Sequence, residues 1–194
     1  MNVLVVFDHP RRSSFGGAVL DSVLAGLAEA GHRAELADLR AEGFDPRLPS
    51  EDEPDWSDPD KRYSDRVLEE QARIARNDAL CFVFPVWWWS VPATTKGWID
   101  RVWNNGWAYG ARKLPHRRAL LIATASGSQE SYRKRGYDTA MRTQLLVGMM
   151  EYCGIPESEL KILFDVDESP EVREGHLETA RTLASGFFSV GAQS

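Results

Sequence analysis

Three short and almost continuous apolar runs constrain the fold of this chain more than any other feature. They are residues 2–7 (NVLVVF), 79–84 (ALCFVF) and 118–123 (RALLIA). Runs of this length without polar alternation are typical of strands that are buried on both faces of a parallel sheet. Helical patterns separate the runs, as the crossovers of a parallel sheet require. We therefore expect a three-layer α/β domain with helices on both faces of the sheet.

Two further strands and five helices complete the alternation. Residues 33–39 alternate in polarity, as an edge strand does, and residues 160–164 form the fifth strand. Right-handed crossovers favour the strand order 2-1-3-4-5, and 194 residues suit a single domain, 1–194. Apolar side chains at helical spacing predict helices over residues 15–30, 64–77, 91–102, 141–153 and 170–190, with Ser90 as the cap of the third and Gly31 and Gly154 after the ends of the first and fourth.

In this strand order the carboxyl ends of strands one, three and four meet at the point where open α/β sheets bind ligands. Three loops follow these ends, residues 8–15, 85–90 and 124–132, and we expect them to lie together. The third loop belongs to a longer passage, 124–137 (TASGSQESYRKRGY), which we expect to be irregular. Its small residues would let a ligand approach the backbone closely and bind its amides. The alternative is that the loop only connects a strand to a helix.

The first loop has the chemistry of an anion site. Ser13, Ser14 and Phe15 lie where a helix begins, so their amides and hydroxyls and the helix dipole favour a phosphate. His9 adds a donor, or its ring caps the local backbone. Arg11 and Arg12 add positive charge. The chain has neither G-x-G-x-x-G nor G-x-x-x-x-G-K-[S/T], which argues against a Rossmann dinucleotide site and a nucleoside triphosphatase.

Six of the seven tryptophans fall between residues 84 and 110. Trp87, Trp88 and Trp89 directly follow the third strand, where adjacent flat rings suit a flat aromatic ligand. A hydrophobic anchor or a dimer contact is the alternative, because interfaces are also enriched in aromatic residues.

Composition excludes several classes of partner. The net charge of −6 argues against nucleic acid and anionic membranes, and no segment approaches membrane-spanning length. Cys81 and Cys153 form no C-x-x-C pair, so we expect reduced packing residues in a cytoplasmic protein. The four histidines are scattered and predict no metal site. We expect the acidic residues 51–60 to form a solvated loop.

The central stretch resembles the NAD(P)H:quinone oxidoreductases, the DT-diaphorase group of flavodoxin-like flavoenzymes. That family carries FP-x-x-W-x-x-VPA-x-x-KGW-x-(D/E)RV followed by AY, and near its start H-x-x-x-(S/T)-S-F-x-x-A. The resemblance runs from His9 to about Gly154. The matching residues are Pro85, Trp88, Val91, Pro92, Ala93, Lys96, Gly97, Trp98, Arg101, Val102, Ala108 and Tyr109, and earlier His9, Ser13, Ser14, Phe15 and Ala18.

The resemblance implies a flavin, FMN or alternatively FAD, and ping-pong hydride transfer from NAD(P)H to a quinone or similar planar acceptor. It implies that His9, Ser13, Ser14 and Phe15 hold the flavin phosphate. It implies that Tyr132 is catalytic and contacts the cofactor, and that Trp89, Trp107 and Tyr109 line the acceptor slot. The residues implied to contact the isoalloxazine ring are Pro85, Val86, Trp87, Trp88, Trp89, Thr124, Ala125, Ser126 and Gly127.

The resemblance also implies a homodimer with shared sites, in which Tyr109 closes the site of the other subunit. Trp103, Trp107 and Tyr109 are expected to leave an exposed apolar patch on a monomer. Two departures stand out. TASG replaces the family's TTGG, and Asp138 stands six residues after Tyr132, where the animal enzymes have a histidine, so their Tyr–His proton relay does not carry over.

Two other functions remain open at this stage. An electron-carrier flavodoxin has the same fold, although HPRRSSF is not the Ser/Thr-Gly phosphate loop of those carriers. A flavin-fold regulatory subunit of a transporter is the second alternative.

Overall fold

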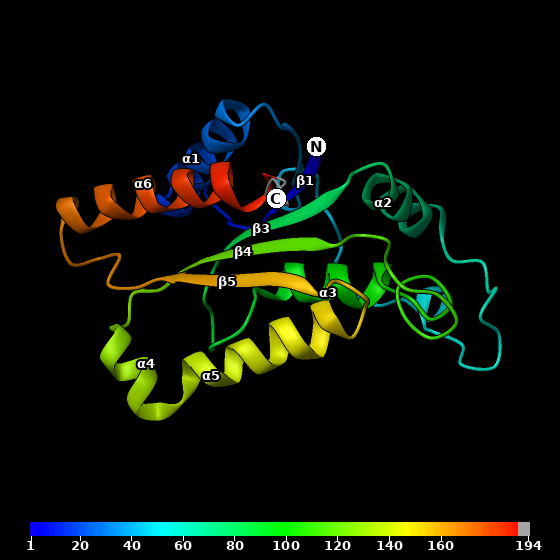
Figure 1. Cartoon of the computed structure of the whole chain (residues 1–194). Helices are drawn as coiled ribbons and strands as arrows, with labels where there is room; N and C mark the ends of the chain where they lie inside the picture. Colours follow the sequence, from blue (N-terminus) through cyan, green and yellow to red (C-terminus); the bar gives the residue numbers. More distant parts are fainter. Residues whose placement is uncertain (190–194) are drawn as a thin grey trace.

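The computed structural model describes residues 1–189 of the chain. Its centre is one sheet of five parallel strands ordered β2-β1-β3-β4-β5 (Figure 1), which confirms the expected order. The strands are β1 (Asn2–Phe7), β2 (Arg33–Asp38), β3 (Ala79–Pro85), β4 (Arg118–Thr124) and β5 (Glu157–Leu163). β5 begins three residues earlier than expected, because its polar residues alternate at the sheet edge, where Glu157 pairs with Arg118.

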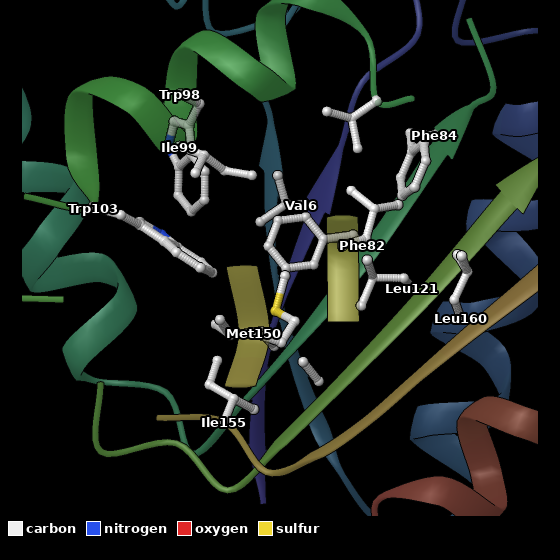
Figure 2. Packing of buried hydrophobic residues seen from close by; sticks show 14 of the residues in the cluster. Val6, Phe82, Phe84, Trp98, Ile99, Trp103, Leu121, Met150, Ile155 and Leu160 are labelled. Carbon is white, nitrogen blue, oxygen red and sulfur yellow. The ribbon is translucent and has the colours of Figure 1, made fainter. Parts of the chain in front are cut away.

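Helices cover both faces of the sheet. α1 (Phe15–Glu29) and α6 (Pro170–Phe187) pack on one face, over one side of β1 and β3. α2 (Asp65–Ala75), α3 (Ala93–Val102), α5 (Tyr137–Arg142) and the π-helix η2 (Thr143–Glu151) cover the other. Figure 2 shows the core of this second face, where Val6, Phe82 and Leu121 of the sheet meet Trp98 of α3 and Met150 of η2. The expected position Val190 of the last helix lies outside the described residues.

Two helical segments differ from the expectation. α4 (Gln129–Arg135) lies within the passage that we expected to be irregular, with Ser128 capping its first turn and Gly136 at its end. The segment after Arg142 is a π-helix instead of an α-helix. Its wider turn brings residue i+5 onto the same face. Met150, and not the expected Met149, is therefore buried after Leu145.

The acidic passage 51–60 is not solvated throughout. Asp52, in the short helix η1 (Ser50–Asp52), is fully buried. Its carboxylate accepts hydrogen bonds from the amide of Ser64 at 3.0 Å and from Arg101 Nη2 at 2.8 Å. This pair joins the passage to the N-terminus of α2 and to α3, so the expected solvated loop is wrong for Asp52.

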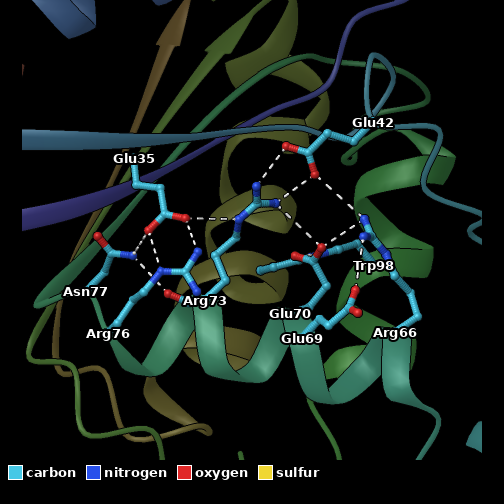
Figure 3. Close-up of polar contacts among 9 residues, drawn as sticks. All are labelled: Glu35, Glu42, Arg66, Glu69, Glu70, Arg73, Arg76, Asn77 and Trp98. Atoms are coloured by element: carbon cyan, nitrogen blue, oxygen red, sulfur yellow. Dashed lines mark hydrogen bonds and ion pairs between the residues drawn. The ribbon is translucent and has the colours of Figure 1, made fainter.

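A second polar network holds α2 against β2 and α3 (Figure 3). Glu70 of α2 is buried and accepts a hydrogen bond from Trp98 Nε1 at 3.0 Å. Arg73 donates hydrogen bonds to Glu35, which lies in β2, and to Glu42, which lies beyond its end. α3 is thereby fixed by its indole as well as by apolar packing.

Candidate active site

The β1–α1 loop presents free amides at the start of a long helix. Ser14 caps α1, and its Oγ accepts the Gly17 amide at 3.2 Å. No hydrogen bond within residues 1–189 involves the amides of Phe15 and Gly16. Free amides at a helix N-terminus attract anions, so this loop fits a phosphate. Ser13 is exposed beside them.

The basic side chains of this loop are not equivalent. His9 Nδ1 lies 2.9 Å from the Arg11 carbonyl oxygen and 3.0 Å from the Arg11 amide, so the ring does cap the local backbone as one alternative held. Arg12 pairs with Asp21 and donates to the Gly17 carbonyl. The hydrogen bond that Arg12 donates to Asp21 raises the pKa of Arg12. The guanidinium of Arg12 is therefore held by residues of α1. Arg11 carries no ion pair in the described part of the chain.

Asp8 is a site residue that sequence reasoning missed. Its buried carboxylate accepts both the backbone amide and the hydroxyl of Thr95 at 2.9 Å, and Arg40 Nε at 3.0 Å. The bonds fix the end of β1 against the start of α3. An acidic residue placed directly after a buried strand was the available signal.

The loop after β3 is a tight turn built from the three adjacent tryptophans. The Trp87 amide donates to the Ser90 carbonyl at 3.2 Å, and the Ser90 amide donates back at 3.1 Å. Trp88 and Trp89 between them have φ of 52° and 54°, which is the type I′ geometry that normally takes Asn or Gly. Such strain collects at functional sites. Ser90 closes this turn and does not cap α3, which Pro92 precedes.

The β4–α4 loop lies beside this turn. The Val86 amide donates to the Thr124 carbonyl at 2.8 Å, and the buried Ala125 is held by the β5 end at 2.8 Å. Ala125 and Ser126 have no positive φ, so TASG costs no backbone strain here. Gly127 is needed for close approach, because a Cβ there would lie 2.9 Å from Tyr132 Cε2.

The loops after β3 and β4 enclose a cavity of about 340 Å³. Trp89 stacks on Tyr137 with ring centroids 4.0 Å apart, and the His9 ring lies 6.5 Å from that of Trp87. The three expected loops are thus brought together. The cavity is lined by Val86, Trp88, Trp89, Ser126, Gly127, Ser131, Tyr132, Arg135 and Tyr137. Ser131, Arg135 and Tyr137 were missed, because they lie in the segment that was expected to be irregular.

Tyr132 lies between two aromatic rings and is only 7% exposed. Its ring centroid is 5.0 Å from Phe164 and 5.9 Å from Tyr137. Burial raises the pKa of Tyr132, so the phenol keeps its proton near neutral pH and can donate a hydrogen bond. Asp138 does not line the cavity, and its Oδ1 accepts the Thr139 amide at 2.8 Å.

Two of the expected acceptor residues lie elsewhere in this chain. Tyr109 lines a separate cavity of about 380 Å³, together with Trp103 and the exposed Tyr152. Trp107 is half-buried against the core. Trp103 is 4% exposed and packs on Phe82. The expectation that it contributes to an exposed patch is therefore wrong.

The described residues hold no group of three or more potential metal ligands. None of the helices in residues 1–189 is long and apolar enough to cross a bilayer. Cys81 and Cys153 are free and buried, which raises their pKa values to about 12 and about 11, as expected of packing residues.

Comparison with known proteins places the chain in a family of flavodoxin-like fold. Residues 1–185 match a family described as having a flavodoxin-like fold. The uncharacterized NAD(P)H oxidoreductase YcaK of Escherichia coli is 37% identical over 83% of this chain and 82% of its own length. The ribosyldihydronicotinamide dehydrogenase (quinone) of Mus musculus is 31% identical over 87% and 84%.

Solved structures agree with this placement. The NAD(P)H:quinone oxidoreductase from Methanothermobacter marburgensis superposes with a TM-score of 0.92 at 34% identity and covers 98% of each chain. An FMN-dependent NADH-azoreductase from Bacillus anthracis, solved in complex with FMN, covers 95% of this chain and 97% of its own at a TM-score of 0.68. At 18% identity, that second similarity concerns the fold alone.

Proposed function

The chain belongs to the flavodoxin-like family that these NAD(P)H oxidoreductases share, and on that basis we propose that it transfers hydride from NAD(P)H through a flavin to a quinone or similar planar acceptor. One observation carries the proposal. A helix N-terminus with free amides and an aromatic cavity meet at one end of the sheet, as a phosphate joined to a flat ring requires.

The residues present fit a flavin. The amides of Phe15 and Gly16, with His9, Ser13 and Ser14 around them, would hold its phosphate. The segment from Pro85 to Trp89 and the backbone of Thr124 to Gly127 would border the ring. Bound flavin supplies the hydride chemistry, and the protein supplies orientation and charge. We propose FMN, with FAD as the alternative.

Tyr132 is the proposed catalytic residue. Its raised pKa keeps a hydrogen-bond donor in the cavity near neutral pH, beside the backbone of Ser126 and Gly127. These donors would stabilise negative charge that develops on the bound ring during reduction. Asp138 is not part of this arrangement, because it does not line the cavity and its carboxylate already accepts the Thr139 amide.

NAD(P)H and the acceptor would occupy in turn the part of the cavity that the bound flavin leaves open, which is a ping-pong mechanism. The exposed ring of Trp88 and the Trp89–Tyr137 stack form flat apolar walls that suit a nicotinamide or a quinone equally.

We propose a homodimer in which Trp107 and Tyr109 cover the site of the partner. The support is that neither residue lines the cavity of its own chain. Tyr109 packs instead against Trp56 at 5.4 Å and Tyr152 at 5.9 Å, and both of these rings are exposed. Exposed aromatic rings gathered in this way are typical of an interface. A cytoplasmic location is proposed from the two free cysteines.

Purification with spectroscopy tests the proposal. We expect a yellow protein whose cofactor, released by heat, is FMN, and which oxidises NADH or NADPH when a quinone is present. A colourless protein that takes up neither FMN nor FAD would end the flavin proposal. A flavin protein that oxidises neither nucleotide would be an electron carrier, and co-purification with a membrane partner would favour a regulatory subunit.

A further inference from the structure

Arg135 places a positive charge at the rim of the aromatic cavity. It is the last residue of α4, where the helix dipole favours a cation, and it lines the cavity beside Tyr132 and Tyr137. Its Nη1 donates to Ser131 Oγ at 2.7 Å, one turn earlier in the same helix. The side chain is exposed, but this bond directs it along the rim.

In the described part of the chain no carboxylate forms an ion pair with this guanidinium. Within residues 1–189 the ion pairs of the chain leave out Arg133, Lys134 and Arg135, the three consecutive cations of α4. Asp138, the nearest acid along the chain, accepts the amide of its neighbour Thr139 instead. The chain as a whole carries a net charge of −6, whereas these three residues of α4 form a local cluster of positive charge.

The cavity therefore combines flat aromatic walls with one unpaired guanidinium. Trp88, Trp89 and Tyr137 fit the ring system of a planar molecule. A guanidinium binds carboxylates and sulfonates through paired, charge-assisted hydrogen bonds, and a neutral quinone has no anionic oxygens to accept them.

We propose that the preferred acceptor is a planar aromatic molecule that carries an acidic group, and that Arg135 binds this group. This inference rests on the proposed function, since it names the substrate class of the same cavity. Arg135 is then a specificity-determining residue, and the hydride transfer itself does not depend on its charge.

A pair of acceptors that differ in one charge tests the proposal. We would measure kcat/KM for 1,2-naphthoquinone-4-sulfonate and for neutral 1,2-naphthoquinone, with Arg135→Gln and, as the matched control, Arg133→Gln from the same helix but outside the cavity lining. Loss of one charge-assisted contact should lower the ratio of sulfonated to neutral acceptor by about tenfold in Arg135→Gln. The ratio should stay at the wild-type value in Arg133→Gln.

Two outcomes would overturn the proposal. Equal losses with both quinones would give Arg135 a merely structural role. A raised KM for NAD(P)H with an unchanged acceptor ratio would assign the cation to the phosphates of the donor. Arg135→Lys should keep part of the preference for the sulfonated acceptor that Arg135→Gln loses, because lysine keeps the charge without the paired donors.

Binding provides a readout that does not depend on turnover. Calorimetry with the purified protein should show that naphthalene-1-sulfonate binds about tenfold more tightly than the neutral naphthalene-1-sulfonamide, and that Arg135→Gln removes the difference. If the protein oxidises no NAD(P)H but keeps this difference, the proposed enzyme activity fails while the anionic-ligand site stands. If turnover occurs and the two naphthalenes bind equally, only the present inference fails.

Discussion

Ser14 allows the anion site to be tested without removing the cap of helix α1. Aspartate caps helices as well as serine does, so Ser14→Asp should keep the bond to the Gly17 amide. The new carboxylate would lie beside the free amides of Phe15 and Gly16, where it would repel a phosphate. We expect FMN affinity to fall by about fivefold or more, since like charges about 4 Å apart repel by about 1 kcal/mol even in water.

Fluorescence titration of FMN, combined with thermal unfolding, checks this result. Ser14→Asn is the neutral control, because it keeps the cap without the charge. If the aspartate and asparagine variants bind FMN equally well, the phosphate does not lie at the start of α1.

Tyr132 allows the catalytic proposal to be tested in the same way. Phenylalanine fits among Tyr137 and Phe164, so Tyr132→Phe should remove the hydroxyl and little else. We expect flavin reduction by NAD(P)H to slow by roughly 10- to 1,000-fold, with nearly unchanged flavin affinity. Asp138→His is the control and should remain active, since Asp138 does not line the cavity. Unchanged reduction rates in stopped flow would remove Tyr132 from the mechanism.

At the scale of elements, the apolar runs were enough to predict the sheet and the meeting of three loops. Strands buried on both faces leave few alternatives, and the ends of parallel strands share one edge of a sheet. α4 was missed because its sequence is short and polar. Its signals were the caps Ser128 and Gly136 on either side. Because that helix carries Arg135, the error hid part of the cavity wall.

Other differences come from tertiary contacts that a periodic pattern does not encode. The π-helix η2 changes the spacing of buried residues from four to five after Leu145. Asp52 is buried because Arg101 lies opposite, and 49 residues separate the two in the chain. The strained turn at Trp88 and Trp89 contradicts local preference, as functional sites commonly do.

His116 joins the end of α2 to the start of β4 and predicts how stability depends on pH. Its Nε2 lies 3.1 Å from the Ile74 carbonyl oxygen and 3.0 Å from that of Asn77. Burial lowers the pKa of His116, and this outweighs the opposing effects of both carbonyls and of Asp78. In the window below the unfolded value of about 6.5, the unfolded chain binds the proton more readily, so acidification should destabilise the fold.

We expect the melting temperature to fall as the pH is lowered from 7.5 to 5.5. The melting temperature of His116→Gln should fall less over the same range. Glutamine keeps a donor for the two carbonyls but does not titrate. The quantity compared is the slope of melting temperature against pH, because the substitution can also change the absolute stability. His32, whose pKa burial also lowers, acts in the same direction and leaves a residual slope. Glu35 has a pKa lowered to about 2, so its contribution is lost only below about pH 4.5, outside this window. Equal slopes of melting temperature against pH for the two proteins would show that folding does not change the pKa of His116.

At the scale of the whole molecule, one chain provides a cavity but not all the aromatic residues that the resemblance implies around it. The sequence identified Trp107 and Tyr109, yet a single chain places them away from the Trp89–Tyr137 wall. Trp103 could not be separated from them by its spacing, although it belongs to the core. A symmetric dimer would bring the two sets together, because each subunit then meets the same surface of its partner.

Mixed dimers test this arrangement directly. Assayed without added FMN, Ser14→Asp should retain little flavin but keeps Trp107 and Tyr109, whereas the double variant Trp107→Ala, Tyr109→Ala should bind flavin but cannot cover a site. Each is expected to be inactive alone. In each mixed dimer one of the two sites has both parts, so purified mixed dimers should show about half of the wild-type activity. The measurement is NAD(P)H oxidation by co-expressed chains with different affinity tags, purified through both tags in sequence. If such doubly tagged dimers form and remain inactive, each chain covers its own flavin and the sites are not shared.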